Sequence, residues 1–178
     1  MVRYLNWNRL LHPQPVYLII SKLGEKVNIM TAAWVSPVSF NPPLLIVSIS
    51  PKRYTYEIIR KTGEFVVSTV SKDLLNIAYY CGSVSGRTRD KVKDLGLNLV
   101  EFKNIGVPYL ANSYASLGCK VEKEVEVGDH VLFVGRVVEM HYDQELFKKG
   151  FLDVSKIDVL FHLGGRYYTT SSRNIIEV

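Results

Sequence analysis

The chain is poor in the residues that build metal centres and disulfide frameworks. Its 178 residues include two cysteines, Cys81 and Cys119, and no C-x-x-C pair. No histidine stands at metal-ligand spacing from either of them. The sequence therefore gives no support to zinc, iron–sulfur or disulfide chemistry, and we expect no metal site and two cysteines buried as small apolar side chains.

Long hydrophobic runs are also absent. Apolar stretches such as residues 44–49 stop after a few positions, whereas a membrane helix needs about 20 consecutive apolar residues. The N-terminus lacks the basic head and continuous apolar segment of a secretory signal. We therefore expect no membrane partner and a location in the cytoplasm.

Several catalytic motifs are missing as well. The sequence has no G-x-S-x-G elbow, no paired-carboxylate constellation and no P-loop. Hydrolase and kinase mechanisms thus lack a starting residue. A bound cofactor that brings its own reactivity would account for an enzyme without these groups.

The charge pattern narrows the partners. The net charge is +5 and the isoelectric point is about 9.1, yet the basic residues are spread among acids rather than gathered with aromatics in one block. That spread disfavours a nucleic-acid groove, so a basic β-barrel that binds nucleic acid is the least favoured hypothesis. The charge fits either attraction to phosphorylated ligands or an ordinary basic surface.

β-Branched apolar runs bounded by Gly, Pro, Asn or Asp dominate the sequence. They predict strands over residues 16–21, 27–35, 44–50, 64–70, 114–127 and 130–142. A Gly128-Asp129 turn between the last two predicts a long antiparallel hairpin. Long hairpins of this kind build barrels and sandwiches.

Helices are expected to be few. Three are predicted, from Thr55 to Lys61, from Ser71 to just before Gly82 and from Arg89 to Leu95, with Thr55 and Ser71 as N-caps and glycines at the ends. No repeat or linker interrupts the chain. The sequence therefore predicts a single, mainly β domain over residues 1–178, a barrel with a few peripheral helices.

Two short runs combine small residues with groups that bind anions. Residues 48–55 end an apolar strand in hydroxyls and lead through Arg53 to a helix start at Thr55, where unpaired N–H groups and a cation suit a phosphate. Residues 85–91 supply a hydroxyl, a glycine and three cations. Each run by itself also fits a helix cap or a solvated loop.

A third run, residues 28–34, offers small residues that admit a flat ring and polar groups that can bond its edge. Its periodicity favours core positions for the Met30 and Trp34 side chains, with their backbone groups facing a ligand. Tyr168 could place a ring near the cofactor plane, and His130 could touch the ligand or a second substrate. Together the three runs predict a split site for a phosphorylated aromatic cofactor, best matched by FMN.

Five blocks of sequence stand in a fixed order between Asn28 and Tyr142. They are N-I-M-T-A-A-W, S-P-V-S-F-N-P-P-L-L-I-V-S-I-S-P-K-R-Y-T, G-E-F-V-V-S, C-G-S-V-S-G-R-T-R-D-K and G-D-H-V-L-F-V-G-R-V. The ordered set resembles the flavin reductase-like family of FMN-binding split β-barrels, particularly its flavoredoxin and ferric reductase branch. The resemblance implies a Greek-key type split barrel that binds FMN without a covalent link, in a homodimer with each site near the interface.

The resemblance also implies roles for particular residues. Residues 31–34 would line the edge of the flavin ring, and residues 48–50 would contact the ring and the ribityl chain. Arg53 and Thr55 would bind the phosphate. His130, the one candidate catalytic residue, would lie where the reductant or acceptor docks. The predicted cofactor-binding residues are Asn28, Met30, Thr31, Ala32, Ala33, Trp34, Ser48, Ile49, Ser50, Arg53, Thr55, Ser85, Gly86, Lys91 and Tyr168.

The implied function is that of an NAD(P)H-dependent flavin or ferric reductase, an oxidoreductase that transfers hydride from NADH or NADPH to FMN. Its electrons would then pass to a small acceptor or a partner redox protein. The alternative is a flavoredoxin-type FMN electron carrier without nicotinamide oxidation of its own. The sequence does not distinguish the two, nor NADH from NADPH.

Overall fold

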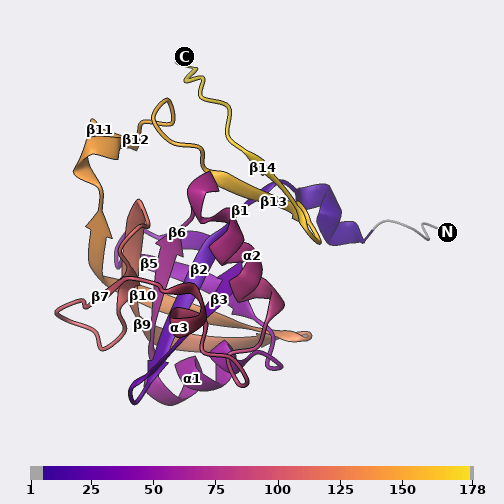
Figure 1. Ribbon diagram of the computed structural model, residues 1–178. Coiled ribbons are helices and arrows are strands. Elements are labelled where there is room, and N and C mark those ends of the chain that lie inside the picture. The colour runs from indigo at the N-terminus through magenta and orange to yellow at the C-terminus, as the bar shows by residue number, and fades with distance from the viewer. Residues whose placement is uncertain (1–5, 177–178) are drawn as a thin grey trace.

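A seven-stranded antiparallel sheet dominates the computed structural model, which describes residues 6–176 (Figure 1). Its strands in spatial order are β3 (Lys26–Ala32), β2 (Tyr17–Leu23), β6 (Glu64–Thr69), β9 (Ala115–Val127), β10 (His130–Tyr142), β5 (Leu44–Ile49) and β4 (Val35–Ser39). Every strand pair in the sheet is antiparallel. The mainly β class predicted from the sequence is confirmed.

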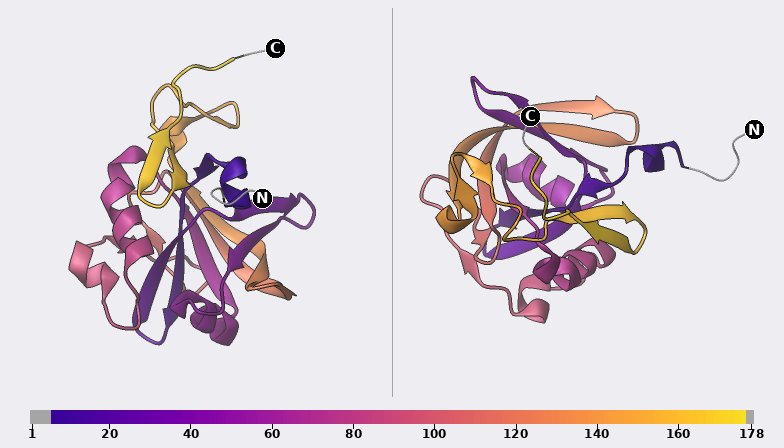
Figure 2. Two further views of the ribbon diagram at one scale, coloured as in Figure 1. Left: turned by 90° about the vertical axis from the view of Figure 1, so that its right-hand side faces the viewer. Right: turned by 90° about the horizontal axis from the view of Figure 1, so that it is seen from above.

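The sheet curls so that its two edges approach each other. The edge strands β3 and β4 are consecutive in the chain, and only Ala33 and Trp34 connect them. Because two residues span only about 7 Å, the edges of the sheet must lie close together, and the sheet forms a barrel that is open between β3 and β4 (Figure 2). The Trp34 carbonyl accepts a hydrogen bond from the Ser48 amide at 3.0 Å, which fixes this link onto β5.

Two hydrophobic cores lie on opposite faces of the sheet. Along β2, Ile19 packs inside the barrel, while Leu18 and Ile20 pack on the outer face. The barrel core includes Phe65 and Phe133, both fully buried, and it is closed by side chains of α1 (Tyr54–Thr62). The outer core lies beneath α2 (Leu75–Ser83), and residues of α3 (Lys91–Leu95) pack against its margin.

Smaller elements extend the structure around the barrel. A three-stranded sheet joins β1 (Gln14–Pro15) to the hairpin of β13 (Leu160–Gly164) and β14 (Tyr167–Thr170). The remaining elements are the 3-10 helices η1 (Trp7–Leu11), η2 (Lys72–Leu74) and η3 (Gln144–Leu146), the pair β7 (Leu99–Val100) and β8 (Tyr109–Leu110), and the pair β11 (Phe147–Lys148) and β12 (Phe151–Leu152). The three-stranded sheet thereby places β1, from the N-terminal part of the chain, beside β13, from its C-terminal part. The C-terminal hairpin lies over one end of the barrel (Figure 2).

The predicted strands are largely confirmed, with one correction. The hairpin of β9 and β10 is present, and Gly128 adopts the positive φ of +59° that its turn requires. The single strand expected over residues 27–35 is wrong, because the chain leaves the sheet at Ala33 and Trp34 and returns as β4. Periodicity could not reveal this break, since both sides of it are apolar.

The predicted helix starts need correction. The first helix begins at Tyr54, with Arg53 at the N-cap, because the Thr55 hydroxyl accepts a hydrogen bond from the Asn28 amide instead of capping. The second helix begins as η2, makes no side-chain cap at Ser71, and runs on as α2 through Gly82 to Ser83.

The third helix begins at Lys91 rather than Arg89. The carboxylate of Asp90 accepts a hydrogen bond from the Lys93 amide at 3.2 Å and so caps the helix. Gly96 ends it in the left-handed conformation, as expected. Among the described residues, no helix combines the length and apolar character that crossing a bilayer requires.

Candidate functional site

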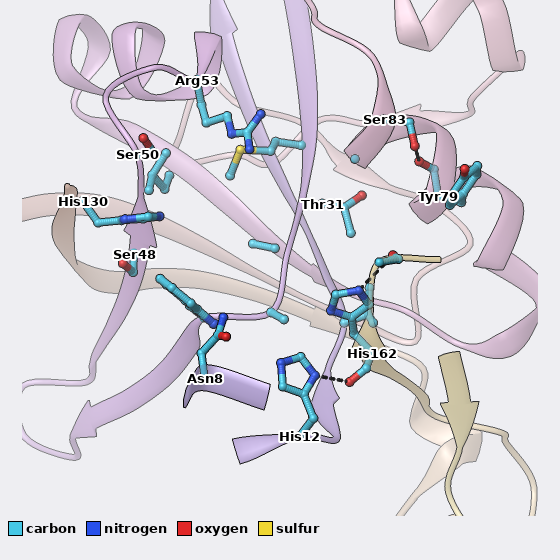
Figure 3. A pocket seen from close by; sticks show the side chains of 18 of the residues that line it. Asn8, His12, Thr31, Ser48, Ser50, Arg53, Tyr79, Ser83, His130 and His162 are labelled. Carbon is cyan, nitrogen blue, oxygen red and sulfur yellow. Dashed lines mark hydrogen bonds between the residues drawn. The ribbon is translucent and has the colours of Figure 1, made fainter. Parts of the chain in front are cut away.

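A cavity of about 420 Å³ opens where the Ala33–Trp34 link crosses between the sheet edges (Figure 3). It is lined by small and hydroxyl-bearing residues from two strands and the link. The predicted residues that line it are Met30, Thr31, Ala32, Ala33, Trp34, Ser48, Ile49, Ser50, Arg53, His130 and Tyr168. Its lining combines hydroxyl groups with apolar side chains such as Ala32 and Ile49, which suits a flat conjugated ring.

A second lobe of about 280 Å³ shares Met30, Thr31 and Arg53 with the first. It lies between the start of α1 and the loop that joins α2 to α3. The predicted residues found there are Asn28, Thr55, Ser85, Gly86 and Lys91. The structure therefore brings all sixteen predicted residues to two adjoining cavities.

The second lobe is lined by basic side chains. They are Lys52, Arg53, Arg87 and Lys91, and none of the described residues that line either lobe is an aspartate or glutamate. Glu57 pairs with Arg87, but the remaining cations leave a positive potential that attracts anions. The second lobe thus has the charge that a phosphate ester requires.

Asn28, Thr55 and Gly86 form a tightly fitted corner of the second lobe. The Asn28 amide nitrogen donates to the Thr55 hydroxyl at 2.8 Å, while the Asn28 Oδ1 atom is buried without a hydrogen-bond partner. An added Cβ at Gly86 would lie 1.8 Å from that oxygen, so only glycine lets the loop backbone approach Asn28. Because the Thr55 oxygen acts as acceptor here, its hydroxyl hydrogen is free to bond a ligand oxygen.

Lys91 reaches the second lobe from inside the protein. Lys91 is 4% exposed, and its ammonium group donates to the carbonyls of Ile29 and Cys81, each at 2.7 Å. Burial lowers the pKa of Lys91; Cys81 opposes this effect and Arg53 adds to it. An ammonium has three hydrogens, so one remains for a ligand, and an anion beside it would offset the cost of its burial.

Arg53 differs from its neighbours in having no competing partner. Arg87 pairs with Glu57 and donates to the Lys52 carbonyl at 3.2 Å, and Arg89 pairs with Asp94 at 2.9 Å. Within residues 6–176 no such bond engages the Arg53 guanidinium, although it lines both lobes. Of the three arginines in the predicted runs, Arg53 is therefore the one available to a phosphate.

His130 and Trp34 meet at the rim of the first lobe. Their ring centroids lie 4.9 Å apart, and Nδ1 of His130 bonds Asp129 Oδ1 at 2.8 Å. This hydrogen bond lowers the pKa of Asp129. Trp34 is 37% exposed, so the expectation of a core side chain is wrong, and its ring instead forms part of the wall of the cavity.

The two cysteines take no part in acid–base or thiolate chemistry. Both are buried, as expected, with Cys81 in the outer core and Cys119 in the barrel core. Burial raises the pKa of Cys81 to about 11 and that of Cys119 to about 12. Both therefore remain neutral thiols at ordinary pH.

The sequence analysis missed a whole wall of the first lobe. Asn8, Arg9 and His12 reach it from the N-terminal segment, Tyr79 and Ser83 from α2, and His162 from β13. Figure 3 shows His12 and His162 across the cavity from Ser48, Ser50 and Arg53. Only the pairing of β1 with β13 brings these segments together, and no local pattern in the sequence signals it.

Comparison with known proteins gives this arrangement a family. The model of the flavin reductase like domain matches residues 8–171. The chain belongs to the flavin reductase-like family. A member from Archaeoglobus fulgidus, of no assigned function, is 41% identical over 97% of both chains. An NADH-dependent flavin reductase from a Rhodococcus species is 32% identical over 67% of this chain and 63% of its own.

Solved structures of this flavin reductase-like type share the architecture. An FMN-binding protein from Thermus thermophilus superposes with a TM-score of 0.88 at 28% identity, covering 100% of this chain and 95% of the other. Flavoredoxin from Methanosarcina acetivorans gives a TM-score of 0.86 at 27% identity, covering 99% and 95%. The split-barrel fold expected from the resemblance is confirmed.

Proposed function

We propose that this protein binds FMN non-covalently across the two lobes and acts as an NAD(P)H-dependent flavin or ferric reductase. The observation that carries the proposal is the shape and charge of the joined cavities. The first lobe is lined by Ala32, Trp34 and Ser48, and it adjoins the second, basic lobe, whose lining includes no aspartate or glutamate among the described residues. Arg53 lines both lobes. A flat ring with a phosphorylated tail matches this shape and charge.

The residues present fit FMN in detail. Asn28 Oδ1 and the hydroxyl hydrogen of Thr55 offer an acceptor and a donor at the corner that Gly86 keeps open. Arg53 and Lys91 would hold the phosphate, and residues 31–34 would bond and orient the ring. When bound, FMN supplies one- and two-electron redox chemistry that the protein side chains lack.

The residues of the first lobe would perform the remaining tasks. Trp34 and His130 cover one rim, so they would exclude water and leave room for a second flat ring to stack. No side-chain acid or base is needed for hydride transfer between two rings. The relatives named as an NADH-dependent flavin reductase, an FMN-binding protein and a flavoredoxin support this assignment.

The second candidate function is a flavoredoxin-type electron carrier, favoured by the flavoredoxin neighbour. Either function is compatible with a homodimer, because η1 exposes Trp7, Leu10 and Leu11 at 74%, 71% and 62% beside the cavity wall. We further propose one domain over residues 1–178 acting in the cytoplasm.

An anaerobic absorption spectrum tests the proposal. The purified protein is recorded alone, then with FMN, then with NADH or NADPH. Bound flavin whose absorption bands bleach with NADH or NADPH supports the reductase and identifies its donor. Bound flavin whose bands persist after both nucleotides favours the carrier. A protein that binds no flavin refutes both.

A comparison of FMN with riboflavin tests the phosphate assignment. Arg53→Gln should lower the affinity for FMN about tenfold or more, since a charge-assisted hydrogen bond to the phosphate contributes about 1.5–3 kcal/mol. Riboflavin, which has no phosphate, should bind the variant and the parent equally. Arg89→Gln is the matched control, because Arg89 pairs with Asp94 and lines neither lobe. Equal FMN affinity in Arg53→Gln and the parent would refute the assignment.

A further inference from the structure

The wall of the first lobe opposite Ser48 and Ser50 is built from side chains that can bind an anion. It consists of Arg9, His12 and His162, which we call the basic wall. These residues come from η1, the segment after it and β13, and two of them are 150 positions apart in the chain. None of them belongs to the lobe assigned to the phosphate.

Backbone carbonyls fix the ring orientation of both histidines. Nδ1 of His12 donates to the His162 carbonyl at 2.8 Å, and Nε2 of His162 donates to the Gly165 carbonyl at 3.2 Å. Because a carbonyl can only accept, each bonded nitrogen must carry the hydrogen. Nε2 of His12 and Nδ1 of His162 are left without a hydrogen, on rings that line the cavity (Figure 3).

Arg9 is built into the same wall. Its Nη1 donates to the Leu163 carbonyl at 3.2 Å, and an added Cβ at Gly164 would lie 1.2 Å from that nitrogen. Gly164, whose φ is +125°, therefore provides the space in which the guanidinium lies. A single backbone bond leaves most of the five guanidinium hydrogens for a ligand.

The surroundings favour a negatively charged ligand. The titratable and charged groups that face the His162 ring are Arg9, His12 and Tyr168, and no described acid lines the lobe. Burial lowers the pKa of His162; the Gly165 bond opposes this, and His12 and Arg9 add to it. Burial therefore disfavours a positive charge on the His162 ring, whereas an anion beside the ring would favour its protonated form.

We propose that the basic wall binds the carboxylate of a small, planar, conjugated electron acceptor whose ring lies in the first lobe. This inference rests on the proposed function, because it names the substrate class of the same site. The first lobe, of about 420 Å³, would have to hold both the flavin ring and this ligand. The ligand is therefore limited to a small molecule that stacks on the flavin.

Benzoate and its neutral analogue benzamide provide a direct test by titration calorimetry on the FMN-loaded protein. Benzoate should bind about tenfold more tightly than benzamide near pH 6, since the carboxylate gains a charge-assisted bond. Its binding should take up protons, seen as a heat that depends on the buffer. The preference should shrink as pH rises, because a neutral His162 no longer attracts the carboxylate.

Two variants locate the site. His162→Gln can still donate to the Gly165 carbonyl through its amide but cannot become charged, and Arg9→Gln removes the guanidinium. Each variant should lower the affinity for benzoate about tenfold and change the affinity for benzamide by less than about twofold. His141→Gln is the matched control, because His141 stacks on Tyr109 at 4.6 Å and does not line the lobe; it should change neither affinity.

Several results would overturn the proposal. They are equal affinities for benzoate and benzamide at every pH, no proton uptake, an equal loss in His141→Gln, or inorganic phosphate that binds as tightly as benzoate. FMN binding is followed in the same samples by flavin fluorescence, and benzoate is also titrated into flavin-free protein. If FMN does not bind but benzoate still distinguishes the variants, the proposed function fails and the basic wall stands.

Discussion

Gly86→Ala is the substitution whose effect the structure defines most sharply. The new methyl group would lie 1.8 Å from Asn28 Oδ1, 2.9 Å from Asn28 Cγ and 3.2 Å from the Tyr54 ring. Asn28 is 3% exposed and cannot simply swing into solvent. Either its amide must shift or the loop between α2 and α3 must withdraw.

The cost follows from these contacts. Overpacking a buried site by one methyl group costs about 1–3 kcal/mol, and losing the 2.8 Å bond from Asn28 to Thr55 adds about 1 kcal/mol. The free energy of unfolding should therefore fall by about 2–4 kcal/mol. Since 1 kcal/mol shifts the melting temperature of a chain of this size by about 2–4 °C, we expect a decrease of at least about 4 °C.

The assay combines thermal melting with titration of FMN followed by flavin fluorescence. FMN affinity should fall at least about tenfold, because Asn28, Thr55 and the loop all line the phosphate lobe. Gly106→Ala is the control: an added Cβ there meets only the flexible Glu64 carboxylate, at 3.4 Å, away from either lobe. A Gly86→Ala protein that melts and binds FMN like the parent would show that Asn28 does not constrain the loop.

Two further predictions concern stability. Phe133→Ala should lower the free energy of unfolding, measured by urea titration, by about 3–5 kcal/mol, because Phe133 is fully buried in the barrel core. Phe40→Ala is the control: Phe40 is fully exposed, so the free energy of unfolding should change by less than about 0.5 kcal/mol. Equal effects would contradict the assignment of the core. Lys148 holds the pKa of Asp153 at about 2, below its usual 3.8. The stabilisation by the ionised Asp153 is thus present above pH 3.8 and lost as pH falls through about 2. Asp153→Asn should therefore lower the melting temperature at pH 7 but have little effect near pH 2. An equal decrease at both pH values would refute this role of Asp153.

The sequence predicted the sheet well because alternation and turn residues act locally. The hairpin of β9 and β10 follows directly from two apolar runs around Gly128. Two residues of the second lobe, Arg53 and Gly86, were equally readable, since they stand in short polar runs at element ends. These signals depend only on neighbours in the chain, so no long-range contact was needed to detect them.

The features that the sequence did not reveal depend on distant partners. Lys91 was expected among the cofactor-binding residues, but only the fold shows that it is buried and donates to the carbonyls of Ile29 and Cys81. His12 and His162 have no partner at short spacing, yet the pairing of β1 with β13 places them on one wall. Thr55 reads as a helix cap because its contact with Asn28 spans 27 positions.

The two-residue link between β3 and β4 also bears on how the chain folds. Ala33 and Trp34 join the first and last strands of the sheet. The first lobe therefore exists only after the strands between them have assembled. Their pairing depends on contacts far apart in the chain, such as Val67 with Leu117, which form slowly. An early folding species could therefore contain the β9–β10 hairpin but no binding slot, and flavin recognition would report completion of the barrel.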